Sequence, residues 1–352
     1  MKNKLLELKE YVNSFNTNKK LVIFGAGDYG RRALKVLKEY GFDVESFYDN
    51  DKLKIGKKID DLIILDPNTI SGNQIILIAS TWSNQIIEQL KSNIKFNGKF
   101  YILDPWFQIM DTSISELDLE KSYNFYNKLN DKHSKEVFDN LINSRMLIEN
   151  FKKSNYEQYY NQNCQPENGD VLIDGGAFVG DTIISLNRTK LEKLKIYSFE
   201  PDNNNYDRLK FEAEKSRFLV TTINLGLWSH KTELRFKSSD EIVGYGCKIE
   251  EEGDIIINTT SIDEYCSLNN IVPTFIKLDV EGAEAETIEG AKNIIRKFKP
   301  KLAISVYHKY KDIWEIPFQI DEICNEYDFY LGHHRTDWFE TILYCNPKKQ
   351  GN

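Results

Sequence analysis

The sequence of 352 residues contains little cysteine, and its cysteines are poorly placed for cross-linking or for holding zinc. There are five, and no two of them form a C-x-x-C pair. An odd number of dispersed cysteines is not typical of a disulfide framework or of a structural zinc site. We therefore expect reduced, mostly buried thiols in a cytoplasmic protein. The cysteines are Cys164, Cys247, Cys266, Cys324 and Cys345.

Long hydrophobic runs are also missing. A membrane-spanning helix needs about 20 consecutive apolar residues, whereas the longest apolar runs here, such as Ile75–Ala79, have only the length of a strand. The segment 1–15 alternates charged with apolar side chains and lacks the continuous core of a signal peptide. The sequence therefore predicts a soluble, cytoplasmic protein with no membrane partner.

Basic residues are fewer than acidic residues. The 46 lysines and arginines are outnumbered by 54 aspartates and glutamates, which gives a formal net charge of -8. Binding to a nucleic-acid backbone requires a basic surface, so we expect no nucleic-acid partner. A small-molecule or carbohydrate substrate is compatible with this charge. The sequence does not determine whether the protein forms a homo-oligomer.

What the sequence does contain is a repeated alternation of short apolar runs with helical segments. Such alternation is typical of β-α-β units on a parallel sheet. It covers residues 19–106 and returns from residue 170 onward, whereas 113–162 has helical spacing and no strand signal. We therefore predict an α/β protein with two Rossmann-like domains joined by helices. The predicted parts are a nucleotide-binding-like domain at 1–110, a helical connector at 111–165 and a second Rossmann-like domain at 166–352.

The strongest single feature is a glycine-rich loop in the second of these domains. The apolar run Val171–Ile173 ends in Asp174, the loop follows, and a helix opens on Asp181 and Thr182. Glycines let a ligand approach the backbone closely, and a helix N-terminus offers free N–H groups. Glu200 ends the next predicted strand, where an acid can accept both ribose hydroxyls of an adenosine. Dinucleotide-binding folds share this plan, but an acid directly at the strand end favours S-adenosylmethionine (SAM).

These residues belong to a set of motifs that resembles the FkbM-type methyltransferases. The motifs are DGGAFVGDT (174–182), SFEP (198–201), INLGLW (223–228), FIKLDVEGAE (275–284) and SVYHK (305–309), and segment 129–160 is similar to a helical lead-in found in part of that family. The resemblance implies a mostly parallel sheet with an antiparallel final strand, and SAM as methyl donor. By position, it implies that the loop binds the methionine end of SAM, Glu200 the ribose and segment 224–227 the adenine. The implied SAM-binding residues are Asp174, Gly175, Gly176, Ala177, Gly180, Asp181, Thr182, Glu200, Pro201, Asn224, Gly226, Leu227 and Asp279.

Candidate catalytic residues follow the next two predicted strands. Methyl transfer depends mainly on alignment of the reacting atoms, but a hydroxyl acceptor must also lose its proton. His308 ends a predicted strand and is the candidate general base or orienter of the acceptor, with Asp279 and Glu281 shaping the pocket. These three side chains could also gather around a divalent cation. Because no close ligand spacing indicates one, we predict no metal site.

A second glycine loop lies near the N-terminus. Gly25, Gly27 and Gly30 form a G-x-G-x-x-G pattern between a strand and a helix, and Asp49 follows the next strand. The region resembles nucleotide-binding N-terminal regions of sugar-modifying enzymes. It predicts a nucleotide or nucleotide-sugar at this loop. The alternative is a scaffold or dimerisation module that keeps the glycines for packing.

The leading hypothesis is therefore a SAM-dependent methyltransferase that O-methylates a hydroxyl of a sugar or glycan precursor in carbohydrate or polysaccharide biosynthesis. The sequence leaves N-methylation and a small-metabolite acceptor open. The alternative enzyme is a nicotinamide-dependent sugar oxidoreductase that uses the N-terminal loop. A non-catalytic assembly protein is a third reading, and the intact acids Asp174, Glu200 and Asp279 count against it.

Overall fold

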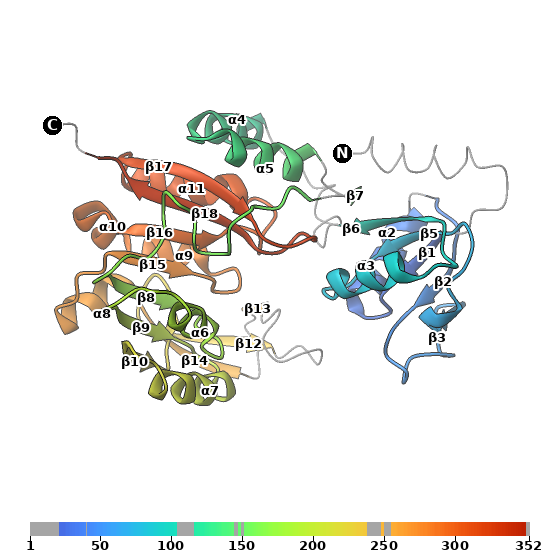
Figure 1. The fold of residues 1–352 in the computed structure, drawn as a ribbon, viewed down its shortest axis with the longest axis horizontal. Coiled ribbons are helices and arrows are strands. Elements are labelled where there is room, and N and C mark those ends of the chain that lie inside the picture. The colour runs from blue at the N-terminus through green and yellow to red at the C-terminus, as the bar shows by residue number, and fades with distance from the viewer. Residues whose placement is uncertain are drawn as a thin grey trace. The chain divides into compact units, whose positions relative to one another are not determined.

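The protein comprises two compact units in a computed structural model that describes residues 21–39, 41–103, 116–143, 147–148, 151–237, 248–249 and 255–349 (Figure 1). The first unit contains 1–115, 136–153 and 335–339, and the second contains 116–135, 154–334 and 340–352. The units are interleaved along the chain, whereas the domains predicted above are continuous. Within the described residues, no helix is long and apolar enough to cross a membrane.

The first unit is built on a mainly parallel sheet of order β3-β4-β2-β1-β5-β6-β7. Its central strands β1 and β5 are buried along their whole length, as expected for strands covered on both faces. The strand β7, which pairs antiparallel with β6, corrects the prediction that 113–162 contains no strand. The elements are β1 (Leu21–Phe24), α2 (Asp28–Glu39), β2 (Val44–Tyr48), β3 (Lys58–Ile59), β4 (Leu62–Leu65), η1 (Pro67–Thr69), β5 (Ile75–Ile78), α3 (Ser83–Ser92), β6 (Lys99–Leu103) and β7 (Leu147–Ile148).

The second unit has a larger sheet of order β10-β9-β8-β15-β16-β18-β17. Its first five strands are parallel, and β18 runs antiparallel to β16, which confirms the expected antiparallel final strand. The strands are β8 (Val171–Gly175), β9 (Lys195–Phe199), β10 (Leu219–Ile223), β15 (Phe275–Leu278), β16 (Lys301–Ser305), β17 (Tyr327–His333) and β18 (Thr341–Pro347). The helices that belong wholly to this unit are α4 (Glu116–Lys128), α6 (Asp181–Asn187), α7 (Asn203–Glu214), α8 (Ile262–Asn269), α9 (Glu284–Glu289), α10 (Lys292–Phe298) and α11 (Asp312–Ile323).

A small second sheet in this unit departs from the predicted pattern. Its order is β11-β14-β12-β13. The apolar segment 218–228 has the sequence pattern of one continuous strand, but the chain leaves the main sheet after Ile223 and enters the small sheet at Gly226. The strands are β11 (Gly226–Leu227), β12 (Glu233–Lys237), β13 (Lys248–Ile249) and β14 (Ile255–Thr260).

The helical lead-in expected over 129–160 is correct only in its first half. The helix α5 (Lys132–Asn143) forms there, but the described residues 151–160 are turns and irregular backbone. This irregular stretch brings aromatic side chains to the core of the second unit: Tyr156, Tyr159 and Tyr160 pack on the buried cluster that contains Leu172 and Phe275.

Candidate active site

The glycine loop lies where β8 meets its two neighbours, β9 and β15. Gly176 has a φ of 72°, in the left-handed region that favours glycine. A Cβ at Gly176 would lie 1.8 Å from the carbonyl oxygen of Asp279, so only glycine lets the loop pass this close to the chain after β15. The helix α6 begins at Asp181, as predicted, with its N-terminal N–H groups at the end of the loop.

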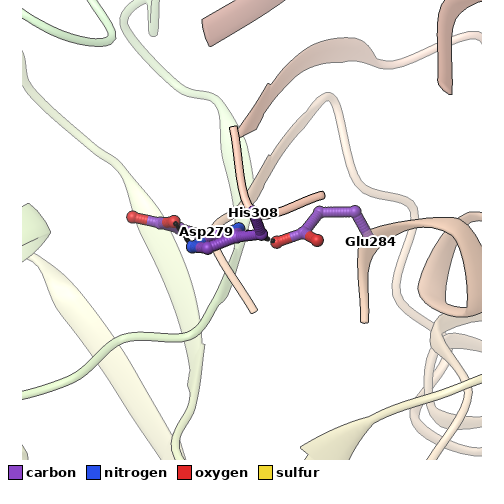
Figure 2. A group of neighbouring side chains, drawn as sticks. All are labelled: Asp279, Glu284 and His308. Atoms are coloured by element: carbon purple, nitrogen blue, oxygen red, sulfur yellow. Dashed lines mark ion pairs between the residues drawn. The ribbon is translucent and has the colours of Figure 1, made fainter. Parts of the chain in front are cut away.

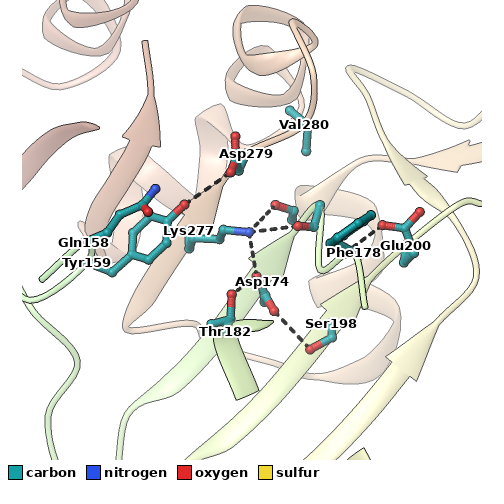
Figure 3. A network of polar contacts seen from close by, with 12 residues as sticks. Gln158, Tyr159, Asp174, Phe178, Thr182, Ser198, Glu200, Lys277, Asp279 and Val280 are labelled. Atoms are coloured by element: carbon teal, nitrogen blue, oxygen red, sulfur yellow. Dashed lines mark hydrogen bonds and ion pairs between the residues drawn. The ribbon is translucent and has the colours of Figure 1, made fainter. Parts of the chain in front are cut away.

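Glu200 lies directly after β9, and its carboxylate is tied to the glycine loop. The backbone N–H of Phe178 donates to Oε2 at 2.9 Å (Figure 3). The backbone N–H of Asp202 donates to Oε1 at 2.9 Å. The residue is 6% exposed, and burial raises the pKa of Glu200 to about 7 in spite of these two hydrogen bonds. A carboxylate that is costly to bury in this way is typical of a functional site.

The other predicted SAM-binding residues gather around Glu200 and the loop. The side chain of Asn224 donates to the backbone carbonyls of Glu200 and Pro201 at 3.0 and 3.2 Å. A Cβ at Gly175 would lie 2.8 Å from the Cδ1 atom of Leu227, which puts β11 against the loop. The ends of β8 and β9 and the start of β11 therefore meet at one edge.

Asp174 faces the protein interior and is fully buried. Its Oδ1 lies 3.1 Å from the Nζ atom of Lys277, which is 2% exposed and also donates to the carbonyl of Gly176 at 2.8 Å. Thr182 and Ser198 donate to the two oxygens of Asp174 (Figure 3). Burial lowers the pKa of Lys277, but Asp174 and further carboxylates outweigh this and hold it above its usual value. The buried pair of Asp174 and Lys277 therefore holds the backbone of the glycine loop in place through the carbonyl of Gly176.

Asp279 follows β15 and is held by two tyrosines. The hydroxyl of Tyr307 donates to Oδ1 at 3.1 Å, and that of Tyr159 donates to Oδ2 at 3.3 Å. Burial would raise the pKa of Asp279, but Lys277 and His308 keep it below its usual value. Asp279 is therefore a carboxylate at neutral pH.

His308 lies between carboxylates at the same edge. Its Nε2 is 3.6 Å from Oδ1 of Asp279 and 3.5 Å from Oε2 of Glu281, while its Nδ1 is 2.9 Å from Oε1 of Glu284. Figure 2 shows the imidazole between the carboxylates of Asp279 and Glu284. His308 does not end a strand as predicted, because β16 stops at Ser305. Its position beside Asp279 and Glu281 is nevertheless as the sequence indicated.

The residues of this cluster differ in their pKa values. Burial lowers the pKa of His308, but the carboxylates, Glu284 first, raise it to about 10. Burial raises the pKa of Glu281 to about 7, against the opposing effect of His308. In this arrangement His308 carries a proton at neutral pH, and Glu281 is the group whose pKa suits a general base. Glu281 also has a left-handed backbone, with a φ of 54°, which is typical of strain at a functional site.

The glycine loop and the carboxylates around His308 lie in one segment of the chain that a family model matches. Residues 174–335 match the family model described as a methyltransferase FkbM domain. The matched span starts at the buried acid of the glycine loop and includes Glu200, Lys277 and His308. The second unit carries an FkbM methyltransferase domain.

Known methyltransferases are similar to this chain. The hexuronic acid methyltransferase AglP of Haloferax volcanii is 26% identical over 181 residues, which are 49% of this chain and 74% of AglP. The crystal structure of the methyltransferase FkbM from Methylobacillus flagellatus KT superposes with a TM-score of 0.65 at 19% identity, covering 96% of this chain and 92% of that one. The second likeness shows a shared fold, and it confirms the α/β architecture expected from the sequence.

The N-terminal loop lies outside the FkbM domain. Residues 17–99 match a different model, described as C2185-like, N-terminal. A Cβ at Gly25 would lie 2.2 Å from the carbonyl oxygen of Ala79, and one at Gly30 would lie 1.8 Å from that of Gly25. Oδ2 of Asp49 accepts a hydrogen bond from the backbone N–H of Ala26 at 2.7 Å. Packing thus accounts for Gly25, Gly30 and Asp49, and the nucleotide expected at Gly27 stays a prediction.

Sequence reasoning missed several residues of the FkbM domain site. Lys277 is the clearest, although a lysine in the middle of the apolar run FIKL was a usable signal: it pairs in register with Asp174 on the next strand. Glu284 belongs to the motif 275–284 but had no predicted role of its own, and the structure adds its contact with His308. No periodic pattern indicated Tyr159, because it lies in irregular backbone.

Proposed function

We propose that this protein transfers a methyl group from SAM to a hydroxyl of a sugar or sugar-containing precursor. The observation that carries the proposal is Glu200, a buried carboxylate tied to the glycine loop by the N–H of Phe178. An acid with this placement suits the two ribose hydroxyls of an adenosine, and the loop offers glycine backbone beside it. When bound, SAM supplies a methyl group already activated on a sulfonium.

The proposed binding residues divide into those that contact SAM and those that position the loop. Gly175–Gly180 and the N-terminal turn of α6 would hold the methionine end, and residues 224–227 would hold the adenine. Asp174 acts indirectly, because Lys277 occupies its carboxylate and both side chains are buried. The fit is also electrostatic, since a cationic ligand suits an edge that carries Asp279, Glu281 and Glu284.

The acceptor is proposed to lie against Asp279, Glu281 and His308. Glu281 takes up the proton of the hydroxyl, because its pKa of about 7 lets it ionise and accept a proton near neutrality. His308, protonated in this arrangement, donates to the acceptor and orients it. Asp279 is kept ionised by Lys277 and His308 and supports His308 from one side.

The sugar acceptor rests on the similarity to AglP, whose name describes a hexuronic acid methyltransferase. A single relative at 26% identity supports a sugar as the class of acceptor, and an assay must identify which sugar accepts the methyl group. Purified protein should transfer labelled methyl from SAM to at least one member of a panel of hexuronic acids, neutral sugars and oligosaccharides that contain them.

Alkali distinguishes the two kinds of product. A methyl ether formed on a hydroxyl survives mild alkaline hydrolysis, whereas a methyl ester formed on a uronic carboxylate releases methanol. We expect the alkali-stable product, and label released as methanol would contradict the hydroxyl acceptor. Glu281→Gln should lower turnover by about 100-fold or more, while Glu286→Gln, on the exposed side of α9, should leave it unchanged.

A further inference from the structure

We propose that Glu340 determines acceptor specificity: its carboxylate accepts hydrogen bonds from the hydroxyls of a neutral sugar and disfavours a sugar acid. Glu340 lies just beyond the matched FkbM span 174–335, and neither the family match nor the known relatives assign it a role. The proposal deepens the function proposed above and rests on it, because it concerns the acceptor of the same reaction.

The main sheet of the second unit places Glu340 at the edge that carries the proposed acceptor site. Glu340 directly precedes β18, which runs antiparallel to β16. The start of β18 therefore lies beside the end of β16, and the N–H of Val306 donates to the carbonyl of Thr341 at 2.9 Å. Tyr307 and His308 follow Val306 directly. Glu340 is thus brought beside the segment that carries the proposed acceptor-orienting histidine.

Two side chains from the irregular stretch 151–160 connect Glu340 with Asp279. Nε2 of Gln158 donates to Oε2 of Glu340. The next residue, Tyr159, donates to Oδ2 of Asp279 at 3.3 Å, and Figure 3 shows both side chains next to that carboxylate. A carboxylate can accept about four hydrogen bonds, so the bond from Gln158 fixes Glu340 without using up its acceptors.

The charge of Glu340 acts on three residues of the proposed acceptor site: Tyr159, Tyr307 and Glu281. Burial is the main reason that the pKa values of these three residues are raised, and the negative charge of Glu340 raises them further. Such an effect requires proximity, because screening weakens the interaction of charges over about 10 Å. The carboxylate of Glu340 therefore lies near the proposed base Glu281 as well as near the tyrosines that hold Asp279.

Backbone strain is concentrated around the same residues. Of the eight described residues other than glycine that have a positive φ, Asn270 and Lys299 lie at the ends of helices. Four others belong to the proposed donor and acceptor sites: Tyr159, Phe178, Glu281 and Glu340. The φ of Glu340 is 63°, and strain of this kind persists mainly at functional sites. A side chain at this position is therefore retained for what it contacts rather than for the stability of the backbone.

The charges of the site favour a neutral acceptor. Three carboxylates belong to the acceptor site in this proposal, those of Asp279, Glu281 and Glu340. Of the described cations at this edge, Lys277 is already paired with Asp174, and His308 with the carboxylates around it. Lys309 is exposed, so water and salt screen its charge. Sugar hydroxyls donate to carboxylates, whereas the carboxylate of a sugar acid is repelled by them.

The test compares pairs of acceptors that differ in one carboxylate: the methyl glycosides of glucose and glucuronic acid, of galactose and galacturonic acid, and of mannose and mannuronic acid. Transfer of labelled methyl from SAM by the full-length protein gives kcat/KM for each member. For the pair that it uses best, the wild type should prefer the neutral sugar by about tenfold or more. Glu340→Gln should remove this preference and raise the KM for the neutral sugar about tenfold or more, with a smaller change in kcat.

Two further variants separate recognition from stability. Glycine suits a left-handed backbone, so Glu340→Gly should unfold at a temperature no lower than that of the wild type and still lose the selectivity. A merely structural glutamate would instead lower the unfolding temperature and leave selectivity as it was. The matched control is Glu286→Gln, which removes the same charge from an exposed position of α9 and should keep the selectivity of the wild type.

Binding of the same glycosides, followed by ligand-observed nuclear magnetic resonance with S-adenosylhomocysteine present, distinguishes the possible failures. Methylation of sugars with equal selectivity in the wild type and in a folded Glu340→Gln protein would overturn the role of Glu340 alone, as would a wild type that prefers the sugar acids. Preferential binding of neutral sugars that Glu340→Gln loses, without methyl transfer, would support Glu340 as a sugar-binding residue and overturn the proposed function. Absence of any sugar binding and of any transfer to a sugar would overturn both.

Discussion

Glu200 shows how a single residue of this fold is set up for binding at a cost to the unliganded protein. Its carboxyl is buried, and burial raises its pKa to about 7. A carboxyl whose pKa is higher in the folded than in the unfolded state stabilises the fold only while it is protonated. Its contribution is therefore lost as the pH rises from about 4.5 to about 7. The ionised form of Glu200 is also the form that would accept hydrogen bonds from the ribose hydroxyls of SAM.

This ionisation predicts the pH dependence of SAM binding. The charged form of Glu200 accepts hydrogen bonds from two hydroxyls better than the neutral form does, so affinity should rise with pH through about 7. Between about pH 8 and pH 6 the ionised fraction falls roughly tenfold, and calorimetry should find affinity weaker by up to about that factor. Glu200→Gln should bind weakly at both pH values. Affinity of the wild type that is independent of pH in this range would contradict the assignment.

For single residues, the sequence predicted the acidic side chains of the site better than the side chains that contact them. Asp174, Glu200 and Asp279 were identified because parallel strands end at one edge, which is a property of the chain pattern. Lys277 and Tyr159 were not, because their contacts depend on register and on an irregular segment. His308 lies beside Asp279 and Glu281 as expected, although it does not end its strand. Its ionisation was not predictable, since it is determined by contacts with three carboxylates of the connection after β15.

The loop between β8 and α6 is the element on which the proposed SAM site depends, and two glycines test it. Gly176 and Gly169 both have positive φ, at 72° and 84°. A Cβ at Gly169 would meet nothing within 4 Å, whereas one at Gly176 would collide with the carbonyl of Asp279. The two positions therefore differ in the room that they leave for a Cβ atom. Both would impose the same kind of backbone strain on a residue other than glycine.

Replacing each glycine by alanine separates these effects. Gly169→Ala should cost only the left-handed backbone, about 1–2 kcal/mol, and leave affinity for S-adenosylhomocysteine unchanged. Gly176→Ala should cost about 3 kcal/mol or more, because overpacking adds to the strain, and should abolish binding. Thermal unfolding and calorimetry measure both quantities. Equal behaviour of the two variants would mean that the close approach to Asp279 is unimportant.

Among the strands, buried apolar runs were predictable, whereas β17 and the strands β12, β13 and β14 of the small sheet were not. The runs LVIF, IILI and FIKL are buried throughout, so composition alone indicates them. β17 was missed because Asp328, Gly332 and His333 interrupt its apolar residues, although its buried positions Tyr327, Phe329 and Leu331 alternate. The pairs β12–β14 and β11–β14 depend on distant partners, which a local pattern does not reveal.

For the whole molecule, the two glycine loops look alike in sequence but differ in what surrounds them. In each, an acid after the second strand accepts a hydrogen bond from the loop: Asp49 from Ala26, and Glu200 from Phe178. Only the second loop adjoins a further cluster of carboxylates with a histidine within the described residues. We therefore propose that the chemistry takes place in the FkbM domain and that the first unit serves as a scaffold.

The central claim is that SAM binds at Glu200 and its glycine loop. Calorimetric titration with S-adenosylhomocysteine tests it most directly, with Glu200→Gln and the matched Asp49→Asn as variants and NAD as the competing ligand. The account predicts binding that is retained in Asp49→Asn and weakened about 30-fold or more in Glu200→Gln, the value of a charged hydrogen-bonding group. Binding of NAD that is lost in Asp49→Asn, with no binding of S-adenosylhomocysteine, would contradict the account and move the chemistry to the first unit.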